Sequence, residues 1–316
     1  MATKAVVATA FGGPEVLSVI DMPVRQPHPG EVLIEVRAAG TNPIDYKQYS
    51  GMMGRNPDNL PIHPGREVAG VVTEVADSAE GPAGAIRVGD EVVAFRVAGG
   101  YVGEIVVPAS TVVPKPATLS FEQASGMMLT GATAVHGLAV IRAGAGDTVL
   151  IHGAAGGVGL MAVQLAADAG ARVIGTASEG SHALLREFGT EPVTYGPGLE
   201  ERIRALAPGG VDAAFDAVGG DEALDTSLAV VPDRDRIVTA VASPRAFDAG
   251  IKVIGGAPGA DPGTEIRDAA RLQLVRLAED GKLSVVVAAT YPLAEAAAAN
   301  RALATGHTHG KIILIP

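Results

Sequence analysis

The segment Gly153–Gly159 limits what this chain can fold into more than any other part of the sequence. It follows the short apolar run Thr148–His152, which is typical of a strand buried on both faces. Behind it, Val158, Met161 and Leu165 recur at helical spacing. A strand, a glycine-rich turn and a helix in this order suit a dinucleotide pyrophosphate, because glycine admits the ligand close to the backbone and the helix N-terminus offers free N–H groups. The sequence therefore predicts a nucleotide-binding unit.

The turn itself supplies the first candidate cofactor contacts. Residues 154–159 match the pattern G-x-G-x-x-G, except that alanine stands at the first position. The candidates are Ala154, Ala155, Gly156, Gly157 and Val158.

The end of the next expected strand, Arg172–Ala177, favours NADP over NAD. Proteins that prefer NAD place an acidic residue roughly 20 residues beyond the glycines, where it binds the ribose 2′-hydroxyl. Here small residues leave room for a 2′-phosphate, and Ser178, His182 and Arg186 offer donors for it. Glu179 argues in the other direction, and Arg186 also fits a solvated helix face.

Strand and helix signals alternate through the middle of the chain, which predicts an α/β layer with a parallel sheet. The first third instead has closely spaced Val/Ile runs separated by turns, which predicts an antiparallel sandwich or barrel. Towards the C-terminus we expect a helix from Thr264 to Asp280, a strand over Leu283–Ala288, a helix over Pro292–Thr305 and a strand over Lys311–Ile315.

Length and composition narrow the class of protein. A chain of 316 residues suggests two domains at roughly 150 residues each. The net charge of −11 argues against nucleic-acid or membrane partners. There is no cysteine, so neither disulfides nor thiolate zinc sites form. The N-terminus lacks the pattern of a secretion signal, and we expect a cytoplasmic protein.

Several motifs in a fixed order resemble one family, the zinc-free medium-chain dehydrogenases/reductases of the quinone oxidoreductase (zeta-crystallin-like) group. Their order along the whole chain is more specific than any single match. Besides the glycine turn, the matching segments are Asn42–Asp45 (N-P-x-D), Pro64–Gly70 (P-G-x-E-x-A-G), Gly131–Ala134 (G-x-T-A), Asp212–Gly220 and Gly310–Leu314.

The resemblance implies a fold and an assembly. We expect a GroES-like β domain over residues 1–118, completed by residues 283–316, and a Rossmann doubly wound parallel-sheet domain that binds NADP over residues 119–282. Relatives form dimers or tetramers through the nucleotide sheet, so we expect a homodimer or homotetramer. Ile251–Gly255 is a candidate interface strand, and it equally fits a plain strand.

The sequence departs from the zinc-dependent relatives at the metal site. Those proteins use a Cys near residues 40–42 and a His before the glutamate, whereas this chain has Gly40–Asn42 and Arg66 there. We therefore expect no metal. An oxygen/nitrogen site made of His63, Glu67 and Asp45 is the remaining alternative. Reduction of an already electrophilic acceptor does not need a Lewis acid.

The resemblance places Asn42, Tyr46 and Lys47 beside the nicotinamide. A quinone or α,β-unsaturated carbonyl that accepts a hydride develops negative charge on oxygen, which nearby donors stabilise. Many relatives have a tyrosine five residues after the asparagine, where this chain has Lys47, so the proton donor stays open. The alternatives are a turn at Asn42 before Pro43 and a surface position for Lys47.

The resemblance also implies further cofactor contacts. Thr130 and Thr133 are candidates for the nicotinamide, although helix-interior threonines also bond to their own backbone. The remaining candidates are Tyr195 for the adenosine phosphate, Val218 and Gly219 for the ribose, and Ala240, Val241 and Ala242 for the carboxamide edge. His307 and His309 are expected to be polar loop residues rather than a ligand pair.

Three functions remain open at this point. The first is an NADPH-dependent reductase of quinones or α,β-unsaturated carbonyls, with a small-molecule partner. The second is a 2-enoyl-thioester reductase, which shares the turn. The third is a nicotinamide-binding protein with a structural or sensory role and little turnover. Reductases that use Tyr-x-x-x-Lys are excluded, because none of the five tyrosines has a lysine four residues later.

Overall fold

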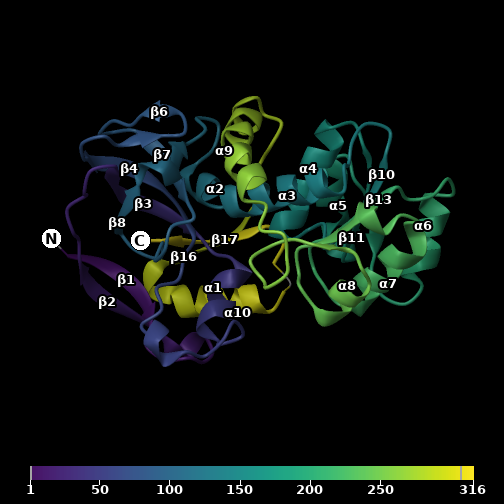
Figure 1. Ribbon diagram of the computed structural model, residues 1–316, viewed down its shortest axis with the longest axis horizontal. Coiled ribbons are helices and arrows are strands. Elements are labelled where there is room, and N and C mark those ends of the chain that lie inside the picture. Colours follow the sequence, from purple (N-terminus) through teal and green to yellow (C-terminus); the bar gives the residue numbers. More distant parts are fainter. Residues whose placement is uncertain (1, 307) are drawn as a thin grey trace. The chain divides into compact units, whose positions relative to one another are not determined.

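The computed structural model describes residues 2–306 and 308–316, so His307 lies outside the described residues. The chain forms two compact units (Figure 1). The first comprises residues 1–129 with 272–316, and the second comprises residues 130–271. The second unit lies inside the expected insertion, 119–282. It is shorter because Gln123 donates to the Val285 carbonyl and Thr118 donates to the Ala278 carbonyl, which ties both flanks to the first unit.

The first unit is built on a mostly antiparallel seven-stranded sheet. Its order is β16-β17-β3-β4-β7-β9, and β8 pairs with β3 off this path. The last strand of the chain therefore pairs with a strand near its start, with Ile313 opposite Gly40 (Figure 1). The strands are β3 (Glu31–Gly40), β4 (Glu67–Val75), β7 (Glu91–Phe95), β8 (Glu104–Pro108), β9 (Val112–Pro114), β16 (Val287–Pro292) and β17 (Lys311–Ile315).

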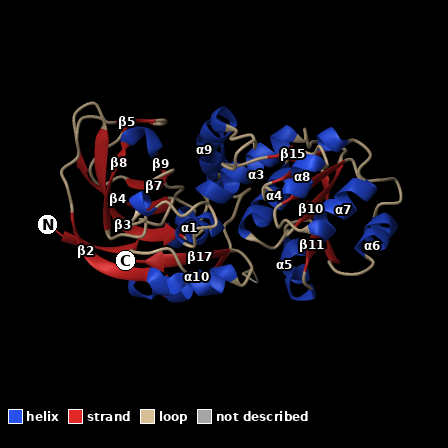
Figure 2. Cartoon of the chain, turned by 60° about the horizontal axis from the view of Figure 1, so that its bottom comes forward, coloured by secondary structure: helices blue, strands red, loops and turns tan. Residues whose placement is uncertain are grey.

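Two short hairpins and three helices complete the first unit. Figure 2 shows α10 lying beside the strand β17, which it contacts. The elements are β1 (Ala2–Ala8), β2 (Leu17–Pro23), β5 (Glu80–Gly81), β6 (Gly84–Ala85), α1 (Pro43–Tyr49), α2 (Phe121–Ser125) and α10 (Ala296–Ala304). Single 3₁₀ turns in the described chain are Pro14–Val16, Pro57–Asn59, Ala109–Thr111, Glu179–Ser181, Arg234–Arg236 and Leu293–Glu295.

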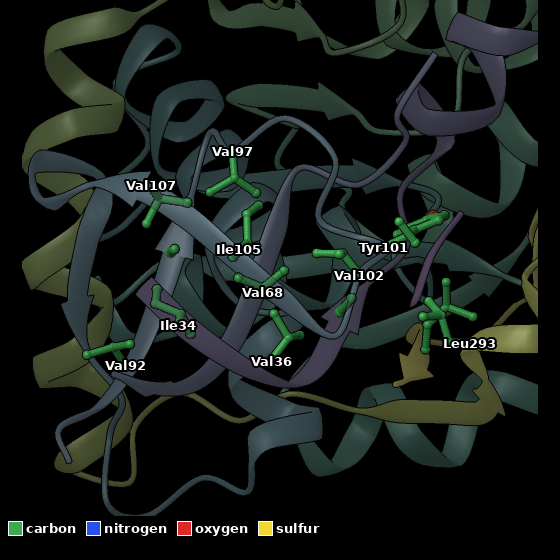
Figure 3. Close-up of a cluster of buried hydrophobic side chains, with 14 of the residues drawn as sticks. Ile34, Val36, Val68, Val92, Val97, Tyr101, Val102, Ile105, Val107 and Leu293 are labelled. Atoms are coloured by element: carbon green, nitrogen blue, oxygen red, sulfur yellow. The ribbon is translucent and has the colours of Figure 1, made fainter. Parts of the chain in front are cut away.

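The core of the first unit is made of Val and Ile side chains from its central strands. Ile34, Val68 and Val92 are at most 3% exposed and belong to one cluster (Figure 3). Branched side chains pack well on a pleated surface, which explains why the Val/Ile runs form strands here. Tyr101 and Leu293 belong to the same cluster (Figure 3), which also contains Ala5 and Leu314 from the two ends of the chain.

The second unit is a six-stranded parallel sheet in the order β12-β11-β10-β13-β14-β15. The chain moves outward from β10 in one direction and then returns to continue on its other side, so β10 marks the point where the winding reverses. The strands are β10 (Thr148–His152), β11 (Arg172–Ala177), β12 (Glu191–Thr194), β13 (Ala213–Asp216), β14 (Ile237–Thr239) and β15 (Lys252–Val253).

Helices accompany these strands, as expected for a doubly wound sheet, so the predicted α/β class is confirmed (Figure 1). They are α4 (Gly157–Asp168), α5 (His182–Glu187), α6 (Leu199–Leu206), α7 (Asp221–Val230) and α8 (Pro244–Asp248). Two further helices, α3 (Met128–Val140) and α9 (Thr264–Glu279), cross the limits of the units. In the described part of the chain, no helix has both the length and the apolar character needed to span a bilayer.

One expected strand was placed too early. Of the expected strand Leu283–Ala288, only Val287 and Ala288 lie in a strand, because pairing begins at Val287, where Lys311 of β17 is the partner. Leu283 and Val285 are buried, at most 3% exposed, but they lie in an irregular segment. Burial alone therefore produced the apolar pattern that resembled a strand.

Other expectations in the same region needed smaller changes. The expected helix over Pro292–Thr305 begins at Ala296, after a 3₁₀ turn. The antiparallel arrangement has one exception in this sheet, the parallel pair β16–β17.

Candidate functional site

The glycine turn lies at the carboxyl end of β10, where the sheet reverses its winding. Gly153 has φ +68°, a conformation that glycine adopts without strain. A Cβ on Gly159 would lie 2.2 Å from the carbonyl oxygen of Gly153, so only glycine fits. The positive φ falls one residue before Ala154, the first position of the matched pattern. Ala154 is fully buried, and its Cβ faces Gly175.

The helix that follows the turn is open at its N-terminus. Gly156 is the N-cap of α4, and no side chain caps this helix. The N–H groups of Gly157 and Val158 therefore lie in a first turn that lacks intrahelical acceptors, which suits an anionic ligand. The turn is also tied to β11, because the N–H of Gly153 donates to the Thr176 hydroxyl at 3.1 Å. The observed backbone fits a pyrophosphate.

Ser178, His182 and Arg186 lie just after β11. His182 and Arg186 are four residues apart on α5, so they share one helix face. The Nε2 atom of His182 is buried and has no hydrogen-bond partner among the described residues. Arg186 is exposed, and no ion pair of its guanidinium occurs in the described chain. The exposed side chain of Glu179 lies in the same stretch.

Tyr195 lies on the loop that follows β12, and the sequence did not predict how this loop is held. Its side chain is 50% exposed. The Arg202 guanidinium donates to the carbonyls of Thr194, Gly196 and Pro197 at 2.8 to 3.1 Å, and so fixes the loop from α6. The only sequence signal for this arrangement is an arginine early in a helix that follows two glycines.

The loops after β13 and β14 meet each other and the glycine turn. A Cβ on Gly153 would lie 2.8 Å from the Cβ of Val218. A Cβ on Gly219, which has φ +79°, would lie 2.7 Å from Val241 Cγ1. The structure thus brings together three of the predicted cofactor segments, and the neighbouring residues Ala240 and Ala242 belong to the last of them.

The first unit holds the segment with the predicted catalytic residues. Asn42 is the N-cap of α1 and is 1% exposed. Its Oδ1 atom accepts a hydrogen bond from Lys311 Nζ at 2.7 Å, and its Nδ2 atom donates to Glu67 Oε1 at 3.1 Å. Both ends of the Asn42 amide are therefore engaged within this unit.

Lys311 and Glu67 form a buried ion pair behind this asparagine. Their side chains are 4% and 0% exposed, and Nζ lies 3.1 Å from Oε1. Lys311 also donates to the Thr41 carbonyl at 2.7 Å, while Glu67 Oε2 accepts the N–H of Leu129 at 2.9 Å. Each charge is thus hydrogen-bonded on several sides. The sequence placed both residues within motifs, but it suggested for Glu67 only the alternative metal site and for Lys311 no role.

Asp45 forms a second buried polar group in the same unit. Its carboxylate accepts the Asn42 N–H at 2.8 Å, the Tyr101 hydroxyl at 2.9 Å and the Gly65 N–H at 3.3 Å. Burial raises the pKa of Asp45 to about 6, although the hydrogen bonds act in the opposite direction. These contacts hold α1 to the body of the unit.

Tyr46 and Lys47 are half-buried on α1. The Tyr46 ring packs against the apolar cluster of Ala8, Tyr49 and Ile62. Among the described residues, no hydrogen bond or ion pair engages the Lys47 ammonium. Lys47 is therefore a cation whose donors are free for a ligand.

Thr130 and Thr133, the candidates for the nicotinamide, are both buried on α3.

The predicted alternative to a protein without a metal is not seen in the described chain. Within residues 2–306 and 308–316, no three His, Cys, Asp or Glu side chains gather as a metal site requires. The alternative site of His63, Glu67 and Asp45 is not assembled, since the two carboxylates bind the partners described above.

Comparisons with known proteins agree with this architecture. The model of the alcohol dehydrogenase GroES-like domain matches residues 28–117, which confirms the GroES-like part of the predicted fold. The model described as zinc-binding dehydrogenase matches residues 189–314. Quinone oxidoreductase from Mus musculus is 32% identical over 330 aligned residues, which cover 99% of this chain and 97% of the mouse protein.

Solved structures are similar over nearly the full length. Escherichia coli quinone oxidoreductase complexed with NADPH has a TM-score of 0.85 at 29% identity, covering 99% of this chain and 100% of the other. CurK enoyl reductase has a TM-score of 0.86 at 26% identity, covering 99% of each chain.

Proposed function

Since the chain belongs to the quinone oxidoreductase family of the medium-chain dehydrogenases/reductases, we propose that it is an NADPH-dependent reductase of quinones or α,β-unsaturated carbonyls that needs no zinc. The observation that carries the proposal is the open N-terminus of α4 behind Gly153, at the point where the sheet reverses. The absence of cysteine supports the zinc-free part, because the cysteine ligand of the zinc-dependent relatives has no counterpart.

The second unit would hold the cofactor. The N–H groups at Gly157 and Val158 bind the pyrophosphate, because they face outward from an uncapped helix with a positive end. Ser178, His182 and Arg186 bind the 2′-phosphate, and the buried His182 Nε2, which has no partner in the part of the chain that the structure describes, supports a ligand there. The Escherichia coli relative, solved with NADPH, supports NADP as the cofactor.

The remaining cofactor contacts follow the loops. Tyr195 lies against the adenosine phosphate, Val218 and Gly219 line the ribose, and Ala240–Ala242 face the carboxamide. Thr130 and Thr133 contribute from α3. NADPH, when bound, supplies the hydride.

The first unit would stabilise the charge that develops on the acceptor. Lys47 presents an ammonium that no described residue engages, and this group would stabilise a negative oxygen and hold a proton for it. Tyr46 lies beside it on α1 and is the second candidate donor. Asn42 is the N-cap of α1, and because Lys311 and Glu67 engage its amide, it orients the start of this helix.

A second candidate is reduction of a 2-enoyl thioester. The similarity to CurK enoyl reductase favours it, since the likeness covers both chains almost completely. The hydride acceptor is again a carbon conjugated to a carbonyl, so the same residues would act.

Oxidation of NADPH by the purified protein tests both candidates. The acceptors are a simple quinone, a short enone and an enoyl thioester, with and without a chelator. We expect turnover that a chelator does not change, and the preferred acceptor decides between quinone or enone reduction and enoyl-thioester reduction.

A substitution tests the role of Lys47. Lys47→Met should lower kcat by about 10²-fold, as for loss of one oxyanion donor, whereas Lys4→Met, which removes an exposed ion pair, should not. Tight NADPH binding without turnover on any acceptor would contradict a reductase and favour the sensory role.

We also propose a homodimer or homotetramer. The supporting observation is that β15 is the last strand of its sheet. Among the described residues its strand partner is β14, and beyond it the N–H of Asp261 donates to the Val253 carbonyl next to a bridge between Ile254 and Asp261. Light scattering on the purified protein measures the mass of the assembly and so tests this proposal.

We also propose a cytoplasmic location, which cell fractionation tests.

A further inference from the structure

We propose that Asp216 is a positioning residue that fixes two cofactor loops at once, and that Thr239 carries its effect to the second loop. This inference rests on the proposed function, because it concerns the nicotinamide half of the NADPH site. It assigns roles to two residues that had none from the sequence, where Asp216 was only part of the matching segment Asp212–Gly220.

The first loop is held by one oxygen of the Asp216 carboxylate. Oδ1 accepts the N–H of Val218 at 3.0 Å and the N–H of Gly219 at 2.7 Å. These two residues are the candidates for the ribose, and we assign them to the ribose of the nicotinamide half because Gly219 lies against Val241 of the candidate carboxamide loop. Their backbone therefore takes its position from a side chain at the end of β13.

The second loop is held by the other oxygen through a hydroxyl. The Thr239 hydroxyl donates to Asp216 Oδ2 at 2.8 Å, and Thr239 Oγ1 accepts the N–H of Val241 at 3.0 Å. Val241 belongs to the candidate carboxamide loop. The carboxylate thus reaches this loop through a relay of two hydrogen bonds.

The two loops also touch, so one carboxylate sets their mutual spacing. A Cβ on Gly219 would lie 2.7 Å from Val241 Cγ1, so the Val241 side chain packs directly against the Gly219 backbone. Asp216 and Thr239 are only 5% and 2% exposed.

A buried carboxylate of this kind is costly unless its hydrogen bonds are complete. Within the described residues no cation lies within ion-pair distance of Asp216, and its partners are two backbone N–H groups and one hydroxyl. An apolar residue would avoid the cost of burial but would release both loops. The arrangement therefore serves the loops, which the proposed function places against the nicotinamide and its ribose.

Binding of two probes separates positioning from general stability. NADPH spans both halves of the site, whereas adenosine 2′,5′-bisphosphate lacks the nicotinamide half. We expect Thr239→Val to raise the Kd of NADPH about tenfold, as for loss of a hydrogen bond to a charged group. The Kd of adenosine 2′,5′-bisphosphate should stay within about twofold, because the contacts at Ser178 and Arg186 are untouched. Thr239→Ser restores the hydroxyl and should rescue NADPH binding.

The matched control is Thr190→Val in the same unit. The Thr190 hydroxyl is buried and has no hydrogen-bond partner in the described chain, so its removal should leave both Kd values unchanged. Asp216→Ala should exceed the effect of Thr239→Val, and circular dichroism shows whether it folds. If Asp216→Ala does not fold, the comparison of Thr239→Val with Thr239→Ser still tests the proposal.

The outcomes distinguish this inference from the proposed function. If the wild type binds both probes and Thr239→Val weakens them equally or not at all, the positioning role is wrong and the NADPH site stands. If the wild type binds neither probe, the proposed function fails and the inference fails with it.

Discussion

Glu67 in the first unit and Asp216 in the second are both buried carboxylates, but only Glu67 has a cation beside it. Glu67 and Lys311 join Asn42, Leu129 and the last strand, which lie far apart in the sequence. Asp216 instead joins two loops that begin within 25 residues of it, through neutral donors alone. The first cluster therefore holds the fold together, whereas the second fixes the two loops that we propose lie against the cofactor.

The largest expected effect comes from breaking the buried ion pair. Lys311→Met leaves Glu67 charged and unpaired in the core, which should lower the free energy of unfolding by ~3–5 kcal/mol. Denaturant unfolding measures this loss. Lys252→Met removes the exposed pair with Asp235 and should change stability by at most ~1 kcal/mol. Equal effects of the two substitutions would contradict the structural role of Lys311.

A pH titration sharpens the comparison within the first unit, because Asp45 is buried with neutral hydrogen-bond donors. Burial raises its pKa from an ordinary 3.8 to about 6, so the folded protein holds this proton more tightly than the unfolded chain. The associated stability is present below about pH 4 and is lost as the pH rises through about 6, by about 3 kcal/mol.

The Asp45→Asn variant isolates that contribution. We expect the difference in unfolding free energy between wild type and variant to shift against the wild type between pH 4 and 7. A difference that does not change with pH would mean that Asp45 stays charged in the fold.

A smaller effect on stability is expected at the glycine turn. Gly159→Ala places a Cβ 2.2 Å from the Gly153 carbonyl oxygen, so the turn must shift. We expect a loss of ~1–3 kcal/mol and weaker NADPH binding in fluorescence titrations. Gly209→Ala is the control, since its Cβ would meet nothing within 4 Å. Unchanged NADPH affinity in Gly159→Ala would mean that the glycine turn does not contact the cofactor.

The smallest predicted effect concerns cofactor choice. Arg186→Ala removes an exposed guanidinium and should weaken NADPH about tenfold while leaving NADH unchanged, because only NADPH has the 2′-phosphate. Initial rates with both cofactors measure this ratio. Equal losses for the two cofactors would mean that Arg186 does not contact the 2′-phosphate.

Local patterns in the sequence predicted the second unit well. Strand, glycine turn and helix follow one another within residues 148–168, and the loop after each strand lies at the same edge of a parallel sheet. The positions of Val218 next to the turn and of Val241 next to Gly219 follow from that rule. The hydrogen bonds of Asp216 and Thr239 were not predictable, because no spacing in the sequence links the ends of two neighbouring strands.

The first unit was predicted less completely for a different reason. Its polar cluster joins residues 42, 67 and 311, and only the pairing of the last strand with β3 brings them together. Asn42 was therefore expected as a donor for the substrate, with no sign that Lys311 and Glu67 engage its amide. The misplaced strand at Leu283–Ala288 has the same origin, since pairing partners rather than apolar residues decide where β16 begins.

Steady-state oxidation of NADPH and of NADH by the wild-type protein, with a simple quinone as acceptor and a chelator present, tests the proposed chemistry most directly. We predict turnover with a kcat/KM that is clearly higher for NADPH, because β11 ends in small uncharged residues and Ser178, His182 and Arg186 follow it as donors for a 2′-phosphate. A higher kcat/KM with NADH would mean that Glu179 controls this end of the site. Turnover abolished by the chelator would contradict a reductase that works without zinc.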